Sequence, residues 1–294
     1  MSLPAPPIFD RSTEDVGNLV EFGHVNLRVP DQQQALIFYV MGLGLTRDPY
    51  LVTGVDNAWI NVGTCQFHLP VGPAQRLRGV VGLVMEDLEA LQARLGAITR
   101  RLQGTQFAFE RHGATELRVR CPWGNRIHVH APDAARFGAM VLGMPSVQLD
   151  APPGSVEGIA RFYAQVMGAR VERPSAGTVR VPIGLGESLV FTETDQPLPA
   201  YDGHHIQVAV ADFSGVHRRL LQHGLITEES NQSQYRFVDI VDPDSGAVLL
   251  ALEHEVRSMR HPMYARVLVN RDPGITNSRY ATGHEAGRWV RGPQ

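Results

Sequence analysis

Histidines are the residues of this chain whose type and placement could support chemistry. The segment from Phe22 to Asp31 alternates polar and apolar residues, which predicts a half-buried strand with His24 on its polar side. Short strand-like segments carry the other histidines of interest, which are His68, His128, His130 and His205. Neutral imidazole suits divalent transition metals as a ligand. A lone histidine on a strand is more often an ordinary hydrogen-bonded or exposed group. Whether these histidines form a metal site therefore depends on the elements that position them.

A repeated unit organises the chain around these strands. After the strand of His24, Pro30 and Asp31 predict a helix start, a helix carries Phe38 and Tyr39, and three short strands follow. Comparable units begin near Gly79, Pro145 and His204. The first and third units share a Phe-Tyr pair, and the second and fourth share an Asp followed by Leu or Phe, at nearly the same offset. This self-similarity predicts a duplication of two unlike modules.

The module pattern predicts an α+β fold class. A single module of one strand, one helix and three strands leaves a sheet edge exposed and cannot bury a core alone. We therefore expect two domains of paired βαβββ modules, each a cup-shaped, mostly antiparallel eight-stranded sheet with helices outside. The modules are expected to pair within each half of the chain, in domains at 20–132 and 143–256. The segment 257–294 lacks periodicity and is expected to wrap the body or order a subunit contact.

Composition narrows the function classes. The chain is 43% hydrophobic and 19% charged, as in an ordinary globular protein, and its net charge of −3 argues against binding nucleic acid. No apolar run is long enough to span a membrane, and the N-terminus lacks the pattern of a secretory signal. Cys65 and Cys121 stand outside any CxxC motif, so we expect small buried thiols and a cytoplasmic protein.

Several stretches together resemble the vicinal oxygen chelate superfamily, which includes glyoxalase I, the bleomycin resistance proteins and the extradiol dioxygenases. These stretches are HVNLRVPD with FYVMGLGL, then GLVMEDLEAL, CPWGNRIHVHAP, and HHIQVAVADF with VDPDSGAVLLALEHE. The resemblance covers nearly all of residues 22–256. It implies the predicted fold, and it implies metal ligands at two positions per module, namely the start of the first strand and the middle of the last.

In the N-terminal half, the resemblance places His24, His68 and His128 at three of the four ligand positions, and Val80 at the fourth. His130 replaces His128 if the strand slips by two residues. Three histidines leave coordination positions open for a substrate or water. The alternative is a metal-free pocket in which these histidines bind an anionic or aromatic ligand. Further side chains are expected to line this cup, namely Asn57, Trp59, Asn61 and Gln66.

In the C-terminal half, the resemblance places His205 at one ligand position. The usual glutamate position falls on Leu249 or Leu250, but Glu253 lies close enough to serve if the strand is shifted, and so does Glu255. Ser146 or Gln148 and Phe191 occupy the remaining two positions. Tyr235 lies roughly where extradiol enzymes keep an acid/base tyrosine. The alternative for Glu253 is a solvated strand end.

The resemblance implies a metal-dependent enzyme that acts on a small diol, catechol or hydroxy-carbonyl substrate, either dioxygenase-like or glyoxalase-like. Its cofactor would be a divalent metal ion, with Fe(II), Mn, Ni, Co and Zn all suited to histidine ligands. The alternative is a metal-free protein of the bleomycin resistance type that sequesters a small molecule. Related folds often dimerise, so a homodimer is a further expectation.

Overall fold

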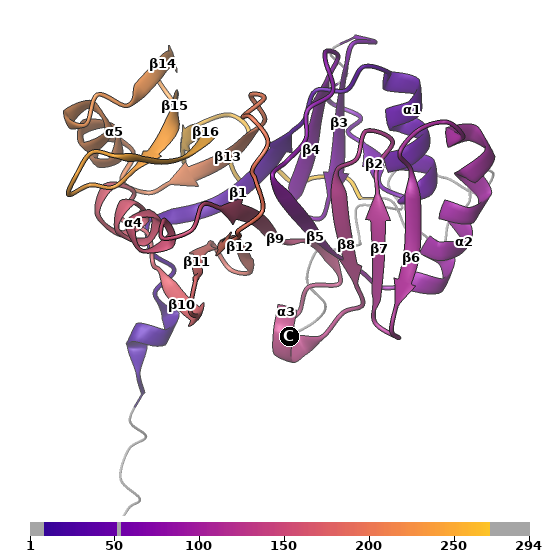
Figure 1. Cartoon of the computed structure of the whole chain (residues 1–294), viewed down its shortest axis with the longest axis horizontal. Coiled ribbons are helices and arrows are strands. Elements are labelled where there is room, and N and C mark those ends of the chain that lie inside the picture. Colours follow the sequence, from indigo (N-terminus) through magenta and orange to yellow (C-terminus); the bar gives the residue numbers. More distant parts are fainter. Residues whose placement is uncertain (1–8, 52–53, 271–294) are drawn as a thin grey trace, which may run out of the picture.

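The computed structural model describes residues 9–51 and 54–270, and two eight-stranded sheets dominate it (Figure 1). Most neighbouring strands run antiparallel, and the helices lie outside the sheets, so the predicted fold class is confirmed. No helix among the described residues is long and apolar enough to cross a membrane. Cys65 and Cys121 are both buried and free, as expected.

The structure contains the four predicted modules. After a short helical turn, η1 (Arg11–Glu14), the first module contains β1 (Leu19–Asn26), α1 (Gln32–Leu36) with a π-helical continuation η2 (Ile37–Gly42), β2 (Thr46–Arg47), β3 (Asn57–Val62) and β4 (Cys65–Pro70). The second contains β5 (Gly79–Met85), α2 (Leu88–Ile98), η3 (Thr99–Leu102), β6 (Ala108–His112), β7 (Glu116–Arg120) and β8 (Arg126–His130).

The second half of the chain repeats this order. The short helix α3 (Ala134–Phe137) leads into the third module, which contains β9 (Leu142–Ala151), α4 (Val156–Arg161), its continuation η4 (Phe162–Val166), β10 (Glu172–Ser175), β11 (Thr178–Ile183) and β12 (Glu187–Glu193). The fourth contains β13 (His205–Val210), α5 (Phe213–Gln222), β14 (Ile226–Asn231), β15 (Gln234–Val241) and β16 (Val248–Ser258).

An aspartate N-cap starts the helix in three of the four modules. The carboxylate of Asp31 accepts from the backbone N–H of Gln34, and Asp87 and Asp212 make the equivalent bonds three residues on. Such a cap satisfies one of the unpaired N–H groups of the first turn and is typically worth about 1 kcal/mol. These local bonds explain why the helix starts were predictable from sequence.

The pairing of the modules differs from the prediction. β1 pairs antiparallel with β13, so the first and fourth modules form one sheet, with the order β14-β15-β16-β13-β1-β4-β3-β2. β5 pairs with β9, so the second and third modules form the other, with the order β10-β11-β12-β9-β5-β8-β7-β6. The expectation that modules of one half share a sheet is therefore wrong. Strand edges pair through backbone groups common to all four modules, so side-chain periodicity does not select the partner.

Helix packing, in contrast, follows the halves of the chain. In Figure 1 the first two modules, with α1 and α2, occupy one lobe, and the last two, with α4 and α5, occupy the other. α2 packs against η2, and α5 packs against η4. Each sheet thus runs from one lobe into the other. The domain limits 20–132 and 143–256 stay a prediction.

The C-terminal segment lies on the first sheet. β16 continues to Ser258, so the expected irregular tail begins later than predicted. Residues 259–270, which we call the strap, then cross the face of the first sheet that carries His24. The side chain of Asn270 bonds both backbone groups of Gly63, in the turn between β3 and β4. The rest of the predicted tail, 271–294, lies outside the described residues.

Candidate metal centre

Three histidines from three neighbouring strands converge on the first sheet. His24 lies on β1, His68 on β4 and His205 on β13, and one ring nitrogen of each lies within 4.8 Å of the others. The register explains the convergence, because Asn26 on the central strand lies directly beside both His68 and His205. His24 precedes Asn26 by two residues and therefore shares its face.

Each of the three histidines has one buried ring nitrogen that lacks a partner among the described residues. His24 is 1% exposed and His205 is 8% exposed. The buried Nε2 atoms of His24, His68 and His205 have no hydrogen-bond partner in the described part of the chain. A buried polar atom without a partner costs about 1–3 kcal/mol, so three at one point call for an explanation. A divalent metal ion fits this donor set, because imidazole nitrogens are among its preferred ligands.

The surroundings keep these imidazoles neutral. Burial, together with the nearby charges of Arg257 and Arg236, lowers the pKa of His68 to about 3. Burial and Arg236 lower the pKa of His205 to about 2, and burial holds the pKa of His24 well below its ordinary value. Neutral imidazole is the form that coordinates a metal.

Two neighbours orient the ring of His68. The indole of Trp59 stacks on it with ring centroids 3.7 Å apart and an interplanar angle of 10°. The side-chain nitrogen of Asn26 lies 2.6 Å from Nδ1 of His68. Coordination through Nε2 requires Nδ1 to carry the proton and donate it. The amide of Asn26 must then present its oxygen, which is half a turn away from the orientation seen.

Two carboxylates border the triad. Glu253 and Glu255 lie on the same face of β16, in the body of the strand. Glu253 Oε1 lies 3.5 Å from Nδ1 of His205, and Glu255 Oε2 lies 3.9 Å from its Nε2. Glu255 therefore faces the unpartnered nitrogen more directly than the expected Glu253. The alternative of a solvated strand end is wrong, because β16 continues past both residues.

Arginines hold the two carboxylates in place. Arg236 on β15 contacts Glu253 through Nη1 and Glu255 through Nη2, each at 2.5 Å. Arg257 contacts the other oxygen of Glu255 at 2.5 Å. These partners offset the cost of burying two anions beside the triad, and they fix the directions of the carboxylates.

The strap covers the sheet face beside His24. A cavity of about 20 Å³ remains beside His24, lined in part by Met263, Arg266 and Leu268 of the strap. The backbone N–H of Ala265 donates to Glu21, and Asn61 donates to the carbonyl of Val269. A volume of this size accommodates about one water molecule. The lining of this cavity includes His24 but neither His68 nor His205, so the strap covers only one side of the triad.

Solved structures share this fold. The chain is 14% identical to a candidate dioxygenase from Bacillus subtilis, with 82% of this chain and 86% of that chain covered and a TM-score of 0.55. It is 14% identical to glyoxalase I from Zea mays, with 85% and 95% covered and a TM-score of 0.51. The chain has the fold of the vicinal oxygen chelate superfamily. No family model matches the sequence, and no curated protein does.

The vicinal oxygen chelate fold unites ligand candidates that the sequence had assigned to separate cups. His24 and His68 of the first module face His205, Glu253 and Glu255 of the fourth, because β1 pairs with β13. His128 and its alternative His130 lie on β8 of the second sheet, away from this group. Their assignment to the same site is wrong, since the second module is not the sheet partner of the first.

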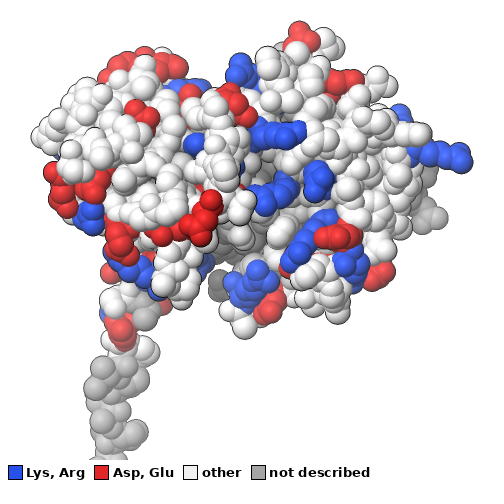
Figure 2. Space-filling view, viewed as in Figure 1, with Lys and Arg blue, Asp and Glu red and all other residues white. Residues whose placement is uncertain are grey.

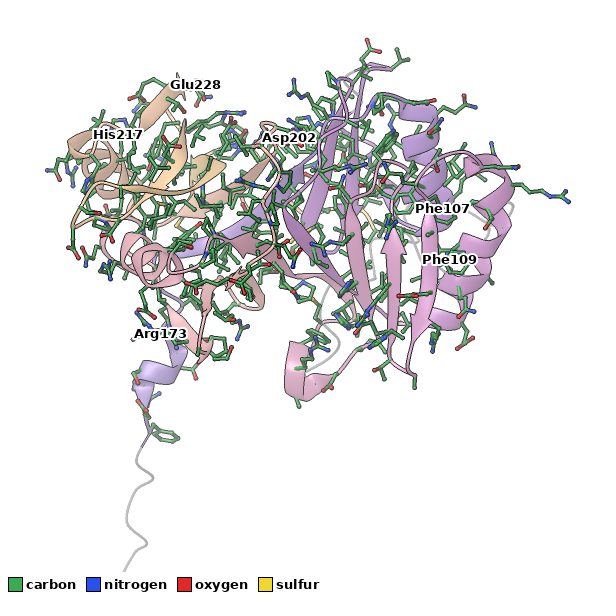
Figure 3. The ribbon with its side chains drawn as sticks, viewed as in Figure 1. Phe107, Phe109, Arg173, Asp202, His217 and Glu228 are labelled. Atoms are coloured by element: carbon green, nitrogen blue, oxygen red, sulfur yellow. The ribbon has the colours of Figure 1, made fainter. Side chains whose placement is uncertain are left out.

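Tyr235 also lies elsewhere. It points away from the triad face of β15, opposite to Arg236, and its hydroxyl donates to the carbonyl of Phe213 at 3.2 Å. Its ring packs on Phe213 and on His217, which Figure 3 shows in the lobe of α5. Burial raises its pKa well above the ordinary value. Side chains along a strand alternate between the two faces of the sheet, and that of Tyr235 lies on the face opposite to the triad. Tyr235 therefore cannot act as an acid or base at the triad.

Sequence reasoning missed Asn26, Arg236 and Arg257. A signal for Arg236 was present, because β15 alternates polar and apolar residues like β16, so an arginine could be expected opposite the glutamates. Asn26 follows His24 by two residues and shares its face, but only the sheet places it between His68 and His205. Trp59 and Gln66 were expected to line this face and do so.

Proposed function

We propose that the chain is a metal-dependent enzyme acting on a small molecule with two adjacent oxygen atoms. One observation carries the proposal, namely the convergence of His24, His68 and His205 with three buried Nε2 atoms that lack partners among the described residues. Carboxylates from β16 complete a mixed nitrogen and oxygen donor set. Fe(II), Mn, Ni, Co and Zn all suit such a set.

A bound divalent ion would act as a Lewis acid toward a diol, catechol or hydroxy-carbonyl group. The chain's own residues would position that group and move its proton. Glu255, which faces Nε2 of His205, is the better placed of the two glutamates to coordinate. Glu253 would then accept the substrate proton, because its second oxygen has no hydrogen bond or ion pair within the described chain.

Arg236 positions both carboxylates in this arrangement. It contacts one oxygen of each and so fixes their directions. A general base must be held within reach of the proton that it accepts, and the contact with Arg236 does this for Glu253. The burial of the triad also excludes bulk water from the reacting group.

Part of the triad remains accessible to solvent. His68 is only partly buried, and the side chain of Glu253 is 22% exposed. The strap covers the neighbouring part of the sheet face, beside His24. A substrate would therefore approach the triad from the side of His68 and Glu253.

Elemental analysis of tag-free protein tests the metal assignment. We expect about one transition metal ion per wild-type chain after anaerobic reconstitution with Fe(II), Mn, Ni, Co or Zn. The His68→Ala variant should lose it, and the His128→Ala variant, changed at the same residue type in the other sheet, should keep it. Wild-type protein that binds none of these ions would overturn the proposal and favour a metal-free binding protein.

Activity assays then separate the two classes of chemistry. Oxygen consumption by metal-loaded protein with a panel of catechols would identify a dioxygenase. Conversion of a hydroxy-carbonyl substrate without oxygen uptake would identify isomerase or lyase chemistry. The Glu253→Gln variant should bind metal but lose most turnover in either case, because the amide cannot accept the substrate proton.

A further inference from the structure

A second hollow lies on the other sheet, apart from the histidine triad. It has a volume of about 450 Å³, within the range of small-molecule sites. Its lining residues come from β6, β7 and β8, and they are Ala108, Phe109, Glu110, Arg118, Val119, Arg120, Arg126 and His128. The chain contains no lysine, so every basic side chain in Figure 2 is an arginine, and arginines gather over β5 to β8 in that view.

Four of these lining side chains form a compact block. Arg118 and Arg120 share one face of β7, and each lies directly opposite a residue of β8. Arg118 is paired with His128, and Arg120 is paired with Arg126. Directly opposed residues in an antiparallel pair have Cβ atoms about 5 Å apart, so all four side chains project from the same face of the sheet as near neighbours.

The block keeps hydrogen-bond donors free. Arg118 donates through Nε to Glu116 at 2.8 Å, and its two Nη groups bond no other residue in the described part of the chain. Arg126 donates through Nε to the carbonyl of Gly79 and through Nη2 to Asp150, which leaves Nη1. Arg120 has no hydrogen bond or ion pair to any residue that the structure describes. Two arginines are thus oriented by neighbours, and the third offers its whole guanidinium group.

The pairing of Arg120 with Arg126 also costs free energy. Like charges placed directly opposite on neighbouring strands destabilise a sheet. Within the described chain, the carboxylate of Asp150 forms an ion pair with Arg126 alone. The single carboxylate in the lining, Glu110, stands opposite Arg118 and has no ion pair with any described residue. An anion seated between Arg120 and Arg126 would remove this repulsion and satisfy the free donors.

We propose that the block of Arg118, Arg120, Arg126 and His128 is a binding site for a small organic anion, held through a carboxylate or phosphate group. The arginine fork matches the oxygens of both groups in a bidentate manner. The volume of the hollow exceeds the needs of the anionic group alone, so it accommodates a carbon skeleton as well. The site is separate from the triad and does not depend on metal.

Isothermal titration calorimetry on the full chain, at constant ionic strength, tests the site. The probes are inorganic phosphate, succinate and the uncharged succinamide. We expect saturable binding of phosphate, succinate or both, with the difference between them identifying the preferred group, and no binding of succinamide. The Arg120→Gln and Arg126→Gln variants should each weaken binding about tenfold or more, as expected for a lost charged hydrogen bond.

Two control variants distinguish the hollow from a general charge effect and from the triad. Arg173→Gln removes the same charge from an exposed arginine on β10, far from the hollow in Figure 3, and should leave the affinity unchanged. His68→Ala disables the triad and should also leave it unchanged. Absence of saturable binding by the wild type would overturn the proposal, as would equal losses in Arg120→Gln and Arg173→Gln. Loss of binding in His68→Ala would assign the anion to the triad instead.

Discussion

Arg266 of the strap forms an ion pair with Asp48, in the loop after β2, with Nη2 and Oδ2 2.5 Å apart. The carboxylate is buried, and it also accepts from the backbone N–H groups of Tyr50 and Leu51. Burial opposes its ionisation, but the bonds from Arg266 and the backbone outweigh burial and lower the pKa of Asp48. The pair therefore links the strap to the sheet that carries the triad.

The Arg266→Ala variant should loosen the strap. The change leaves a buried carboxylate without its cationic partner, at a cost of about 2–4 kcal/mol. Amide hydrogen exchange in residues 259–270 should become faster, while exchange in the central strands β1 and β13 stays slow. Asp48→Asn in combination with Arg266→Ala should cost less than the sum of the two single changes. Unchanged amide exchange in the strap would show that the ion pair between Arg266 and Asp48 does not hold the strap in place.

Asn26 should control metal affinity through His68. Asn26→Leu removes the group beside Nδ1, and we expect metal affinity to fall about 10–100-fold, as is usual for the partner of a ligating histidine. Asn26→Asp should retain affinity, because a carboxylate can accept from Nδ1–H. Competition with a chromophoric chelator measures both. If the Asn26→Asp variant loses as much metal affinity as Asn26→Leu, then Nδ1 of His68 does not donate to the residue at position 26.

Tyr235→Phe should leave both metal content and turnover unchanged. Its hydroxyl bonds only the carbonyl of Phe213 among the described residues, on the far side of the sheet from the triad. Loss of this bond should lower the free energy of unfolding by about 1 kcal/mol. Urea unfolding measures the change in stability, and steady-state kinetics measures turnover. A large fall in turnover with intact stability would return Tyr235 to the site.

Metal-free protein should lose stability as the pH falls below about 6.5. Burial lowers the pKa of His254 to about 4, and the pKa values of His68 and His205 to about 3 and 2. The unfolded chain takes up protons on these histidines near pH 6.5, but the folded chain does not, so protonation favours unfolding. Above about pH 7 these groups contribute no slope.

Urea unfolding between pH 7.5 and pH 5 measures this dependence, with the metal removed. Each such histidine contributes a slope of up to about 1.4 kcal/mol per pH unit. The His254→Gln variant should show a shallower slope than the wild type, since Tyr163 retains a polar partner there while the titrating group is gone. A flat profile over this range would contradict the expectation, because it would show that the histidines bind protons equally in the folded and unfolded chains.

The sequence by itself determined the modules and the faces of their strands. Asp31, Asp87 and Asp212 mark helix starts through bonds within one turn of chain. Alternation placed His24 on the polar face of its strand and Glu253 on the same face as Glu255, because side-chain direction along a strand has a period of two residues. Such features depend on near neighbours in the chain, so they are readable without the fold.

Only the tertiary structure decided which strands meet. The sequence assigned His24, His68 and His128 to one cup and His205 and Glu253 to another, whereas the pairing of β1 with β13 joins His205 and the glutamates to His24 and His68 and leaves His128 apart. Every module offers a similar first-strand edge, and the backbone hydrogen bonds between two edges do not depend on which side chains the strands carry. The partner is chosen by how the helices and the connections pack around both sheets, which no local pattern records.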